Sequence, residues 1–219
     1  MTATARAYAF AKERILDGRF AGGDLISEGD VAAGVGLSRT PVREAFLRLE
    51  SEGLLRLYPK RGALVIPVSA AEVESVMETR LLVERFAIEK VIRLGIDLEA
   101  ELAAAIAHQE SVAASEDSRA FVEADREFHR ILVAAAGNPI LLGLHDSLRD
   151  RQSRMNLAAL ARDERRTRQI LEEHRGLAAA VARRDEGLAR TRVDAHLHTT
   201  LALLRGAPTL LGADPGLPA

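Results

Sequence analysis

The sequence contains no cysteine and no tryptophan, and aromatic residues make up only 4% of its 219 residues. The absence of cysteine excludes disulfide bonds, a thiolate nucleophile and cysteine-based zinc fingers, and it fits a reducing compartment. No run of about 18 apolar residues is present, so no membrane-spanning helix is expected. The N-terminal stretch lacks the apolar centre of a signal peptide, because Lys12, Glu13 and Arg14 interrupt it. These absences together predict a cytoplasmic protein.

Hydrophobic residues make up 47% of the chain, and alanine and leucine dominate them, which favours a mostly α-helical fold. The net charge of −2 is unevenly distributed. Residues 1–68 hold 10 basic and 8 acidic side chains, whereas residues 69–219 hold 20 basic and 24 acidic ones. A slightly basic front part ahead of an acidic rear part weakly indicates a polyanion-binding module at the N-terminus.

Residues 1–68 predict a small DNA-binding domain. Three helices are expected, followed by a two-stranded hairpin that turns between Pro59 and Gly62. The helices are predicted at 4–18, from Ser27 to about residue 33, and from Ser38 to Gly53. This order is that of a winged helix-turn-helix, whose second helix lies in the major groove of DNA.

The residues expected to contact DNA begin that second helix and form the hairpin tip. Arg39 is able to pair with both acceptors of a guanine edge, and hydroxyls at the helix start are able to reach phosphates. The bland alternative is a solvated basic helix face. A polar and basic helix start and a basic hairpin tip occur together here, and this combination favours DNA binding over a solvated helix face. The predicted DNA-binding residues are Ser38, Arg39, Thr40, Arg43, Lys60, Arg61 and Gly62.

Residues 69–205 predict an antiparallel all-helical bundle, and the Gly/Pro-rich stretch 206–219 predicts a flexible tail. Short loops separate the helices, and Gly95, Gly137 and Pro139 mark some of their ends. Six helices are expected, at about 70–94, 97–115, 118–136, 139–157, 162–183 and 186–205.

The stretch Asp-Arg-Glu-Phe-His-Arg raises the possibility of a metal site. Asp125 and His129 lie four residues apart, so their side chains project from the same face of a helix. His174 and His196 lie on later helices and could join them inside a bundle. Such a set suits a divalent ion, with zinc, nickel, iron and manganese all open. Ordinary surface or core histidines remain the alternative at this point.

The front domain resembles the GntR-type bacterial transcription regulators. The resemblance runs from Leu25 to Val65 and is most specific in the segment SRTPVREAFLRLESEGLL. One position departs from the family pattern, because Gly29 stands where the family usually has a basic residue. A DNA contact made by that residue would be absent here.

The rear domain resembles the metal-binding FCD ligand domain of the FadR-like branch of that family. The resemblance implies that Asp125, His129, His174 and His196 bind one divalent metal, most simply zinc, while His198 points to the other side of its helix. It also puts Arg80, and less directly Arg149, in the pocket of a small organic or sugar acid. The alternative for Arg80 is a surface ion pair with Glu84. His108 and His145 are expected at the surface or in a pocket wall.

These features predict a ligand-responsive transcriptional repressor that binds a pseudo-palindromic operator as a homodimer. The competing classes are a metal-dependent enzyme and a direct sensor of the metal itself. The sequence offers no general base in a convincing position and no cofactor-binding loop, so an enzyme is not expected. The stiff connection 66–70, which contains Pro67, would pass a movement of the bundle to the DNA-binding domain.

Overall fold

The structure is a computed structural model that describes residues 1–115, 117–160 and 165–206, with the side chains of 149 and 156–160 outside that description. Two compact units meet at Ser69 and Ala70, one residue from the predicted boundary. The expected tail at 206–219 lies outside the described residues, apart from Gly206.

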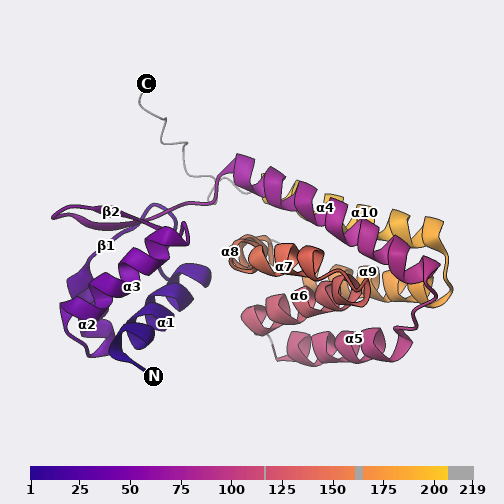
Figure 1. The fold of residues 1–219 in the computed structure, drawn as a ribbon, viewed down its shortest axis with the longest axis horizontal. Helices are drawn as coiled ribbons and strands as arrows, with labels where there is room; N and C mark the ends of the chain where they lie inside the picture. Colours follow the sequence, from indigo (N-terminus) through magenta and orange to yellow (C-terminus); the bar gives the residue numbers. More distant parts are fainter. Residues whose placement is uncertain (116, 161–164, 207–219) are drawn as a thin grey trace. The chain divides into compact units, whose positions relative to one another are not determined.

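The N-terminal unit contains three helices and a small sheet (Figure 1). Its order agrees with the predicted winged helix-turn-helix, with α2 and α3 packed against each other. The elements are α1 (Ala3–Leu16), β1 (Leu25–Ile26), α2 (Glu28–Val35), α3 (Arg39–Ser51), β2 (Leu55–Tyr58) and β3 (Gly62–Val65).

Local capping chemistry fixes the turn between α2 and α3. The Ser27 side chain accepts a hydrogen bond from the backbone N–H of Asp30 and so begins α2. Gly36 ends the helix with a positive φ of 68°, a conformation that glycine adopts at little cost. Ser38 occupies the N-cap position of α3, but its hydroxyl makes no capping hydrogen bond. That hydroxyl therefore stays available at the helix start.

The predicted two-stranded hairpin is part of a three-stranded antiparallel sheet with the order β1-β3-β2. Leu25 pairs with Leu64, and Ile26 pairs with Ala63. The sequence did not predict β1, because a two-residue strand has too few side chains for a periodic pattern. Gly62 explains part of the arrangement, since its φ is 108° and a side chain there would collide with the carbonyl oxygen of Ile26. Glycine at this position therefore has a structural role in the sheet.

The C-terminal unit is all-helical (Figure 1). Helix α10 packs along α4, and α6 packs against α4, α5, α7 and α8. The elements are α4 (Ala70–Arg93), α5 (Glu99–Ala114), α6 (Ser118–Ala135), α7 (Pro139–Ser147), α8 (Arg149–Leu160), α9 (Arg166–Ala182) and α10 (Glu186–Arg205).

The single helix expected at 139–157 is wrong, because the helix is interrupted at Leu148 and two helices are present. The backbone N–H of Leu148 donates to the carbonyl of His145, three residues back, instead of continuing the four-residue pattern. No glycine or proline lies between His145 and Arg149 to signal the break. The apolar positions alone could not distinguish one helix from two.

Helix α6 brings polar side chains into the core of the bundle. Its buried face carries Phe121, Phe128 and Leu132, and Asp125 and His129 lie buried on the same face. The apolar neighbours stabilise the helix against the rest of the bundle, so the two polar groups are carried inward with them. No helix among the described residues is long and apolar enough to cross a membrane.

Phe46 provides a test of the N-terminal core. Its side chain is fully buried in α3, whereas the adjacent Leu47 is 52% exposed. We expect Phe46→Ala to lower the free energy of unfolding of this unit by about 3–5 kcal/mol. Leu47→Ala should stay within about 0.5 kcal/mol of the parent. The two tyrosines of the chain, Tyr8 and Tyr58, both lie in this unit, so urea unfolding followed by tyrosine fluorescence reports on it. Equal effects of the two substitutions would contradict this core.

Candidate metal centre and nucleic-acid interface

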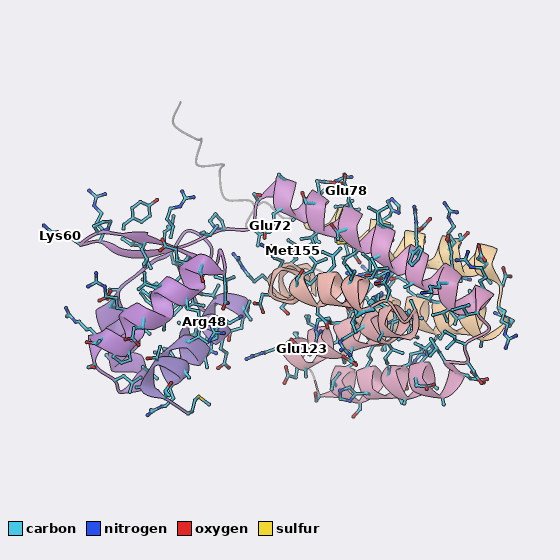
Figure 2. The ribbon with its side chains drawn as sticks, viewed as in Figure 1. Arg48, Lys60, Glu72, Glu78, Glu123 and Met155 are labelled. Carbon is cyan, nitrogen blue, oxygen red and sulfur yellow. The ribbon has the colours of Figure 1, made fainter. Side chains whose placement is uncertain are left out.

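Five of the seven residues predicted to contact DNA line one groove of the N-terminal unit, and Ser38 and Thr40 are not among its lining residues. The side chains at the start of α3 and at the hairpin tip are exposed, while Gly62 is half-buried in the sheet. Figure 2 shows Lys60 at the tip of the hairpin between β2 and β3. The groove is lined by residues of both elements, among them Arg39, Arg43, Lys60, Arg61 and Gly62. A helix start and a basic hairpin around one groove form the surface that a winged helix presents to DNA.

Gly29 lies directly under the guanidinium of Arg39. A Cβ atom added at Gly29 would lie 3.4 Å from Nη2 of Arg39, so the guanidinium occupies space that a larger side chain would need. The guanidinium of Arg39 thus lies beside the position where the family pattern has a basic residue.

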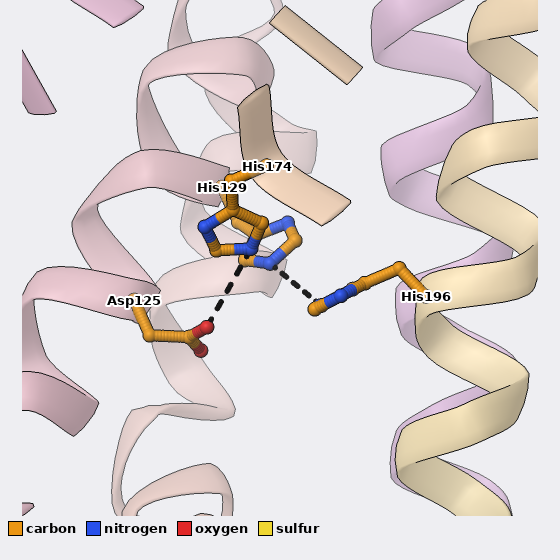
Figure 3. Close-up of side chains that lie close together, drawn as sticks. All are labelled: Asp125, His129, His174 and His196. Atoms are coloured by element: carbon orange, nitrogen blue, oxygen red, sulfur yellow. Dashed lines mark hydrogen bonds and ion pairs between the residues drawn. The ribbon is translucent and has the colours of Figure 1, made fainter. Parts of the chain in front are cut away.

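Four side chains meet in the interior of the C-terminal unit (Figure 3). Asp125 and His129 come from α6, His174 from α9 and His196 from α10, and all four are buried. One potential ligand atom from each lies within 4.8 Å of the others. The i,i+4 spacing brings the first pair together, as predicted, and helix packing adds the other two.

The three histidines turn the same nitrogen toward the centre. Nε2 of His129 lies 3.2 Å from Nε2 of His196, and Nε2 of His174 lies 3.6 Å from Oδ1 of Asp125. The Nδ1 atoms point outward to other partners. One imidazole nitrogen of each ring is therefore directed to a common point, with a carboxylate oxygen beside it.

Each outward nitrogen lies close to one buried or half-buried acceptor. Glu84 of α4 places Oε2 2.8 Å from Nδ1 of His129. Gln109 of α5 places Oε1 2.9 Å from Nδ1 of His174. Such contacts select the ring tautomer that leaves Nε2 unprotonated, which is how outer residues orient histidines that bind metals.

The third histidine is held by a longer chain of polar contacts. Nδ1 of His196 is 2.6 Å from Oε2 of Glu173, the residue before His174. Glu173 accepts a hydrogen bond of 3.0 Å from Arg166, which also donates to the hydroxyl of Thr200 at 2.9 Å. The guanidinium of Arg166 is almost completely buried. Its contacts fix Glu173, and Glu173 in turn fixes the ring of His196.

The electrostatics of the centre favour neutral imidazoles. Burial lowers the pKa of His174 well below its ordinary value, and the cations around it lower it further. Burial also lowers the pKa of His196, although Glu173 acts in the opposite direction. A neutral imidazole is the form that binds a metal ion. At neutral pH the rings of His174 and His196 are therefore in the form that binds a metal ion.

The donor set fits a divalent metal ion. Nε2 of His174 is buried and has no hydrogen-bond partner, which is costly unless a ligand satisfies it. Three imidazole nitrogens and one carboxylate oxygen also match the ligands of zinc and of neighbouring transition metals. Zinc, nickel, iron and manganese share this preference, so the donor set does not choose between them.

Arg80 forms the ion pair that the sequence left as its alternative, but the pair is buried instead of exposed. Its Nε donates to Oε1 of Glu84 at 2.7 Å, and both side chains are inaccessible to solvent. Burial raises the pKa of Glu84, but Arg80 and then His129 outweigh it, and the net pKa lies well below its usual value. Because Glu84 also contacts His129, Arg80 lies one residue away from the metal-ligand set.

The remaining predicted side chains divide into three cases. His145 is buried beside Glu84 and leaves both ring nitrogens without a hydrogen bond, so it is not at the surface. His108 and His198 are exposed. The side chain of Arg149 lies outside the described residues. The sequence did not single out Gln109, Glu173 and Arg166, because each looks like an ordinary polar residue on an amphipathic helix.

Together, the winged helix-turn-helix and the helical unit with its buried Asp/His₃ centre define a DNA-binding regulator with a second, all-helical domain. The chain matches the family "Bacterial regulatory proteins, gntR family" over residues 3–65 and the FCD domain over residues 75–199. It belongs to the GntR family, with an FCD domain as its C-terminal part.

Individual relatives agree with this assignment. An HTH-type transcriptional regulator from the TAR-I ttuE-ttuC′ intergenic region of Agrobacterium vitis is 34% identical over 134 residues, which cover 59% of this chain and 78% of the relative. The gluconate operon transcriptional repressor of Bacillus subtilis is 30% identical over 137 residues, covering 62% of this chain and 56% of the relative. These families and relatives are transcriptional regulators, and this chain is likewise a regulator and not an enzyme.

Solved structures support the same fold. A GntR regulator from Rhodococcus sp. RHA1 superimposes with a TM-score of 0.75 at 24% identity, over 93% of this chain and 98% of that one. The E. coli protein McbR/YncC gives a TM-score of 0.73 at 22% identity, over 94% and 98% of the two chains. The predicted class, a winged helix-turn-helix followed by an all-helical domain, is confirmed.

The metal centre is tested by removing one ligand. We expect the parent, purified without chelator, to contain about one equivalent of divalent metal, and His129→Ala to lose it. A bound metal stabilises the folded state by about 3–4 kcal/mol when its concentration exceeds the dissociation constant by a hundredfold to a thousandfold. The variant should therefore melt at a lower temperature, and chelator should destabilise only the parent.

The matched control is His198→Ala, which removes an exposed imidazole two residues from His196. Elemental analysis should find the same metal content in this control as in the parent, and thermal unfolding should give the same melting temperature. Retention of the full metal content by both His129→Ala and His174→Ala would contradict the site.

Proposed function

We propose that the protein is a ligand-responsive transcriptional repressor whose C-terminal domain binds a small organic or sugar acid at a divalent metal ion, zinc in the first instance. The observation that carries the proposal is the convergence of three Nε2 atoms and the Asp125 carboxylate inside a domain fused to a DNA-binding unit. The gluconate operon repressor among its relatives supports an acid as the effector. As a DNA-binding protein of bacterial type it would work in the cytoplasm.

The side chains that would hold the ion are Asp125, His129, His174 and His196. A divalent ion there supplies a Lewis-acidic centre that attracts the oxygens of an acid. Arg80 is proposed to donate to the same acid through its terminal nitrogens, because its Nε already bonds to Glu84. Arg149 is proposed as a second effector-binding residue on the strength of its place in the family pattern.

At the N-terminal unit, Ser38, Arg39, Thr40 and Arg43 are proposed to contact the major groove. Lys60 and Arg61 are proposed to contact the backbone or minor groove, with Gly62 shaping the hairpin. A homodimer on a pseudo-palindromic operator is proposed because two such units read two symmetric half-sites. The exposed apolar pair Leu82 and Phe86, which are 72% and 43% exposed at i,i+4 on α4, supports self-association of the chain.

DNA recognition is tested at Arg39 and Lys60. Arg39→Ala should weaken operator binding by about 1–3 kcal/mol and relax the base preference, because a paired guanine edge is lost. Lys60→Ala should weaken binding to every sequence by a similar factor and reduce the salt slope by about one phosphate contact. Titration of operator and scrambled DNA at several salt concentrations distinguishes the two effects. Parent-like operator binding by Arg39→Ala would show that another element reads the bases.

The Gly29→Arg variant is tested by the same titration of operator and scrambled DNA at several salt concentrations. An arginine there would begin 3.4 Å from the guanidinium of Arg39 and place a second cation beside it, so the two side chains are expected to repel each other. We expect a changed base preference together with a steeper salt dependence, because one cation is added near the phosphates. Gly29→Ala, whose Cβ would lie 3.4 Å from Nη2 of Arg39, is the milder control.

The coupling between effector and DNA is tested at Arg80 without removing its charge. Arg80→Lys keeps a cation beside Glu84 but loses the planar guanidinium. Without effector, we expect this variant to bind the operator with the affinity of the parent. In the parent, effector should change operator affinity by about 5- to 150-fold, as is typical of coupled sites, and in the variant this change should be smaller. The matched control is Arg85→Lys on the same helix, where the arginine pairs with Asp194. A parent-like response in both variants would remove Arg80 from the switch, and DNA release by metal alone would favour a metal sensor.

A further inference from the structure

Helix α3 contributes an acid to the basic groove of the N-terminal unit. The residues of α3 that line the groove recur every three or four positions, so they lie along one face of the helix: Arg39, Arg43, Phe46 and Glu50. Glu50 is half-buried in the last turn. A carboxylate in a groove that faces DNA repels a polyanion. Its presence there therefore calls for a role other than attraction of the phosphates.

The contact made by Glu50 is with the hairpin. Its Oε1 accepts a hydrogen bond of 2.7 Å from the backbone N–H of Leu57 in β2. The sheet has the order β1-β3-β2, so β2 is an edge strand, and the N–H groups on its outer side have no strand partner. Glu50 provides an acceptor for one of these groups. The reading helix is thereby tied to the outer edge of the hairpin.

Other bonds hold the base of the hairpin and its inner edge. The backbone N–H of Leu54 donates to the carbonyl of Leu49 at 2.9 Å, and β3 pairs with β1 through Ala63 and Ile26. Glu50 acts further out, at Leu57. Removal of its carboxylate therefore leaves the sheet in place and frees the outer part of the hairpin.

The tip of the hairpin is a tight turn that follows the strand behind it. The backbone N–H of Arg61 donates to the carbonyl of Tyr58 at 3.0 Å and closes the turn. The ring of Pro59 fixes one φ angle within it, and Lys60 has a positive φ of 64°. Because this turn is short and closed, a displacement of Leu57 displaces the basic tip as well.

Helix α3 is held from its other side by α1. The carboxylate of Glu52 accepts hydrogen bonds from Nζ of Lys12 at 2.9 Å and from the hydroxyl of Tyr8 at 2.8 Å. The end of α3 is thus fixed in the helical core, and Glu50 positions the hairpin relative to it.

We infer that Glu50 is a positioning residue that holds Lys60 and Arg61 at the place where they reach the DNA backbone. The inference deepens the proposed function and rests on the hairpin contacts proposed there. Glu50 acts through the N–H of Leu57 and does not itself contact DNA. Without its carboxylate, the base contacts of α3 remain and the phosphate contacts of the hairpin are weakened.

The test compares substitutions that separate the charge of Glu50 from its hydrogen bond. The full-length protein is titrated with short duplex DNA of random sequence at several salt concentrations. Glu50→Ala should bind about threefold to tenfold more weakly, with a salt slope reduced by about one phosphate contact. Glu50→Asp keeps the charge but is too short for the bond, so it should weaken binding too. Glu50→Gln keeps an acceptor oxygen and should bind at least as tightly as the parent.

The matched control is Glu28→Ala, because Glu28 is a half-buried acid of α2 that lines the same groove. Loss of its charge removes repulsion only, so binding should be equal to that of the parent or tighter. Urea unfolding followed by tyrosine fluorescence checks that each variant is folded. If Glu50→Ala does not fold, Glu50→Asp takes its place in the comparison.

A double-mutant cycle distinguishes positioning of the hairpin from a general effect on α3. In a protein that carries Lys60→Ala and Arg61→Ala, the further change Glu50→Ala should alter neither the affinity nor the salt slope, because the contacts that Glu50 positions are absent. Damage to α3 itself would weaken binding equally in both backgrounds. Sequences selected from the random pool by Glu50→Ala should show the base preference of the parent.

The outcomes separate the inference from the proposed function. Parent-like or tighter binding by both Glu50→Ala and Glu50→Asp overturns the inference, and so does an equal loss in both backgrounds or an equal loss in Glu50→Gln. In each of these cases the proposed hairpin contacts stand if Lys60→Ala with Arg61→Ala weakens binding. Parent-like binding by that double variant contradicts the proposed contacts themselves, and the inference fails with them.

Discussion

The C-terminal domain depends on how it satisfies a polar centre that its own hydrophobic core encloses. Burying imidazoles and carboxylates among leucines and phenylalanines is costly unless every nitrogen and oxygen has a partner. Nδ1 of His174 and Nδ1 of His196 have such partners in Gln109 and Glu173, and Nδ1 of His129 lies 2.8 Å from a carboxylate oxygen of Glu84 without a well-aligned hydrogen bond. The Nε2 atoms face the common centre, and that of His174 makes no hydrogen bond. The fold therefore contains an incomplete set of interactions that a divalent cation would complete.

This requirement explains why so many helices contribute to one site. The ligands come from α6, α9 and α10, and their outer partners come from α4, α5 and α9. A shift of any of these helices would separate a histidine from its acceptor as well as from the common centre. Binding energy at the centre is thus distributed over the helix packing of the domain. Occupation of one small site would therefore bias the arrangement of several helices at once.

Sequence reasoning named the four side chains that converge in the core, but not the residues that hold them, for a physical reason. Asp125 and His129 share a helix, so their spacing fixes their proximity, and the family pattern supplied His174 and His196. Glu84 was considered only as a surface partner of Arg80, because an i,i+4 pair looks the same in solvent and in a core. Burial of that pair is decided by the helices that cover α4, which local sequence does not encode. The same limit applies to β1, whose two residues are held by backbone pairing with β3 and leave no pattern.

The two units differ in where their charged side chains lie, exposed in one and buried in the other. At the DNA groove the cations Arg39, Arg43 and Lys60 are exposed, so water and salt screen them and binding depends on their number and placement. In the interior of the bundle the charges of Arg80 and Glu84 are removed from solvent, and each has to be matched individually. A polyanion is held by the sum of many weak contacts, and this sum falls as the salt concentration rises. A buried charge, in contrast, is stable only when the groups around it match it, so the interior of the bundle responds to single charges and the exposed groove responds to their total.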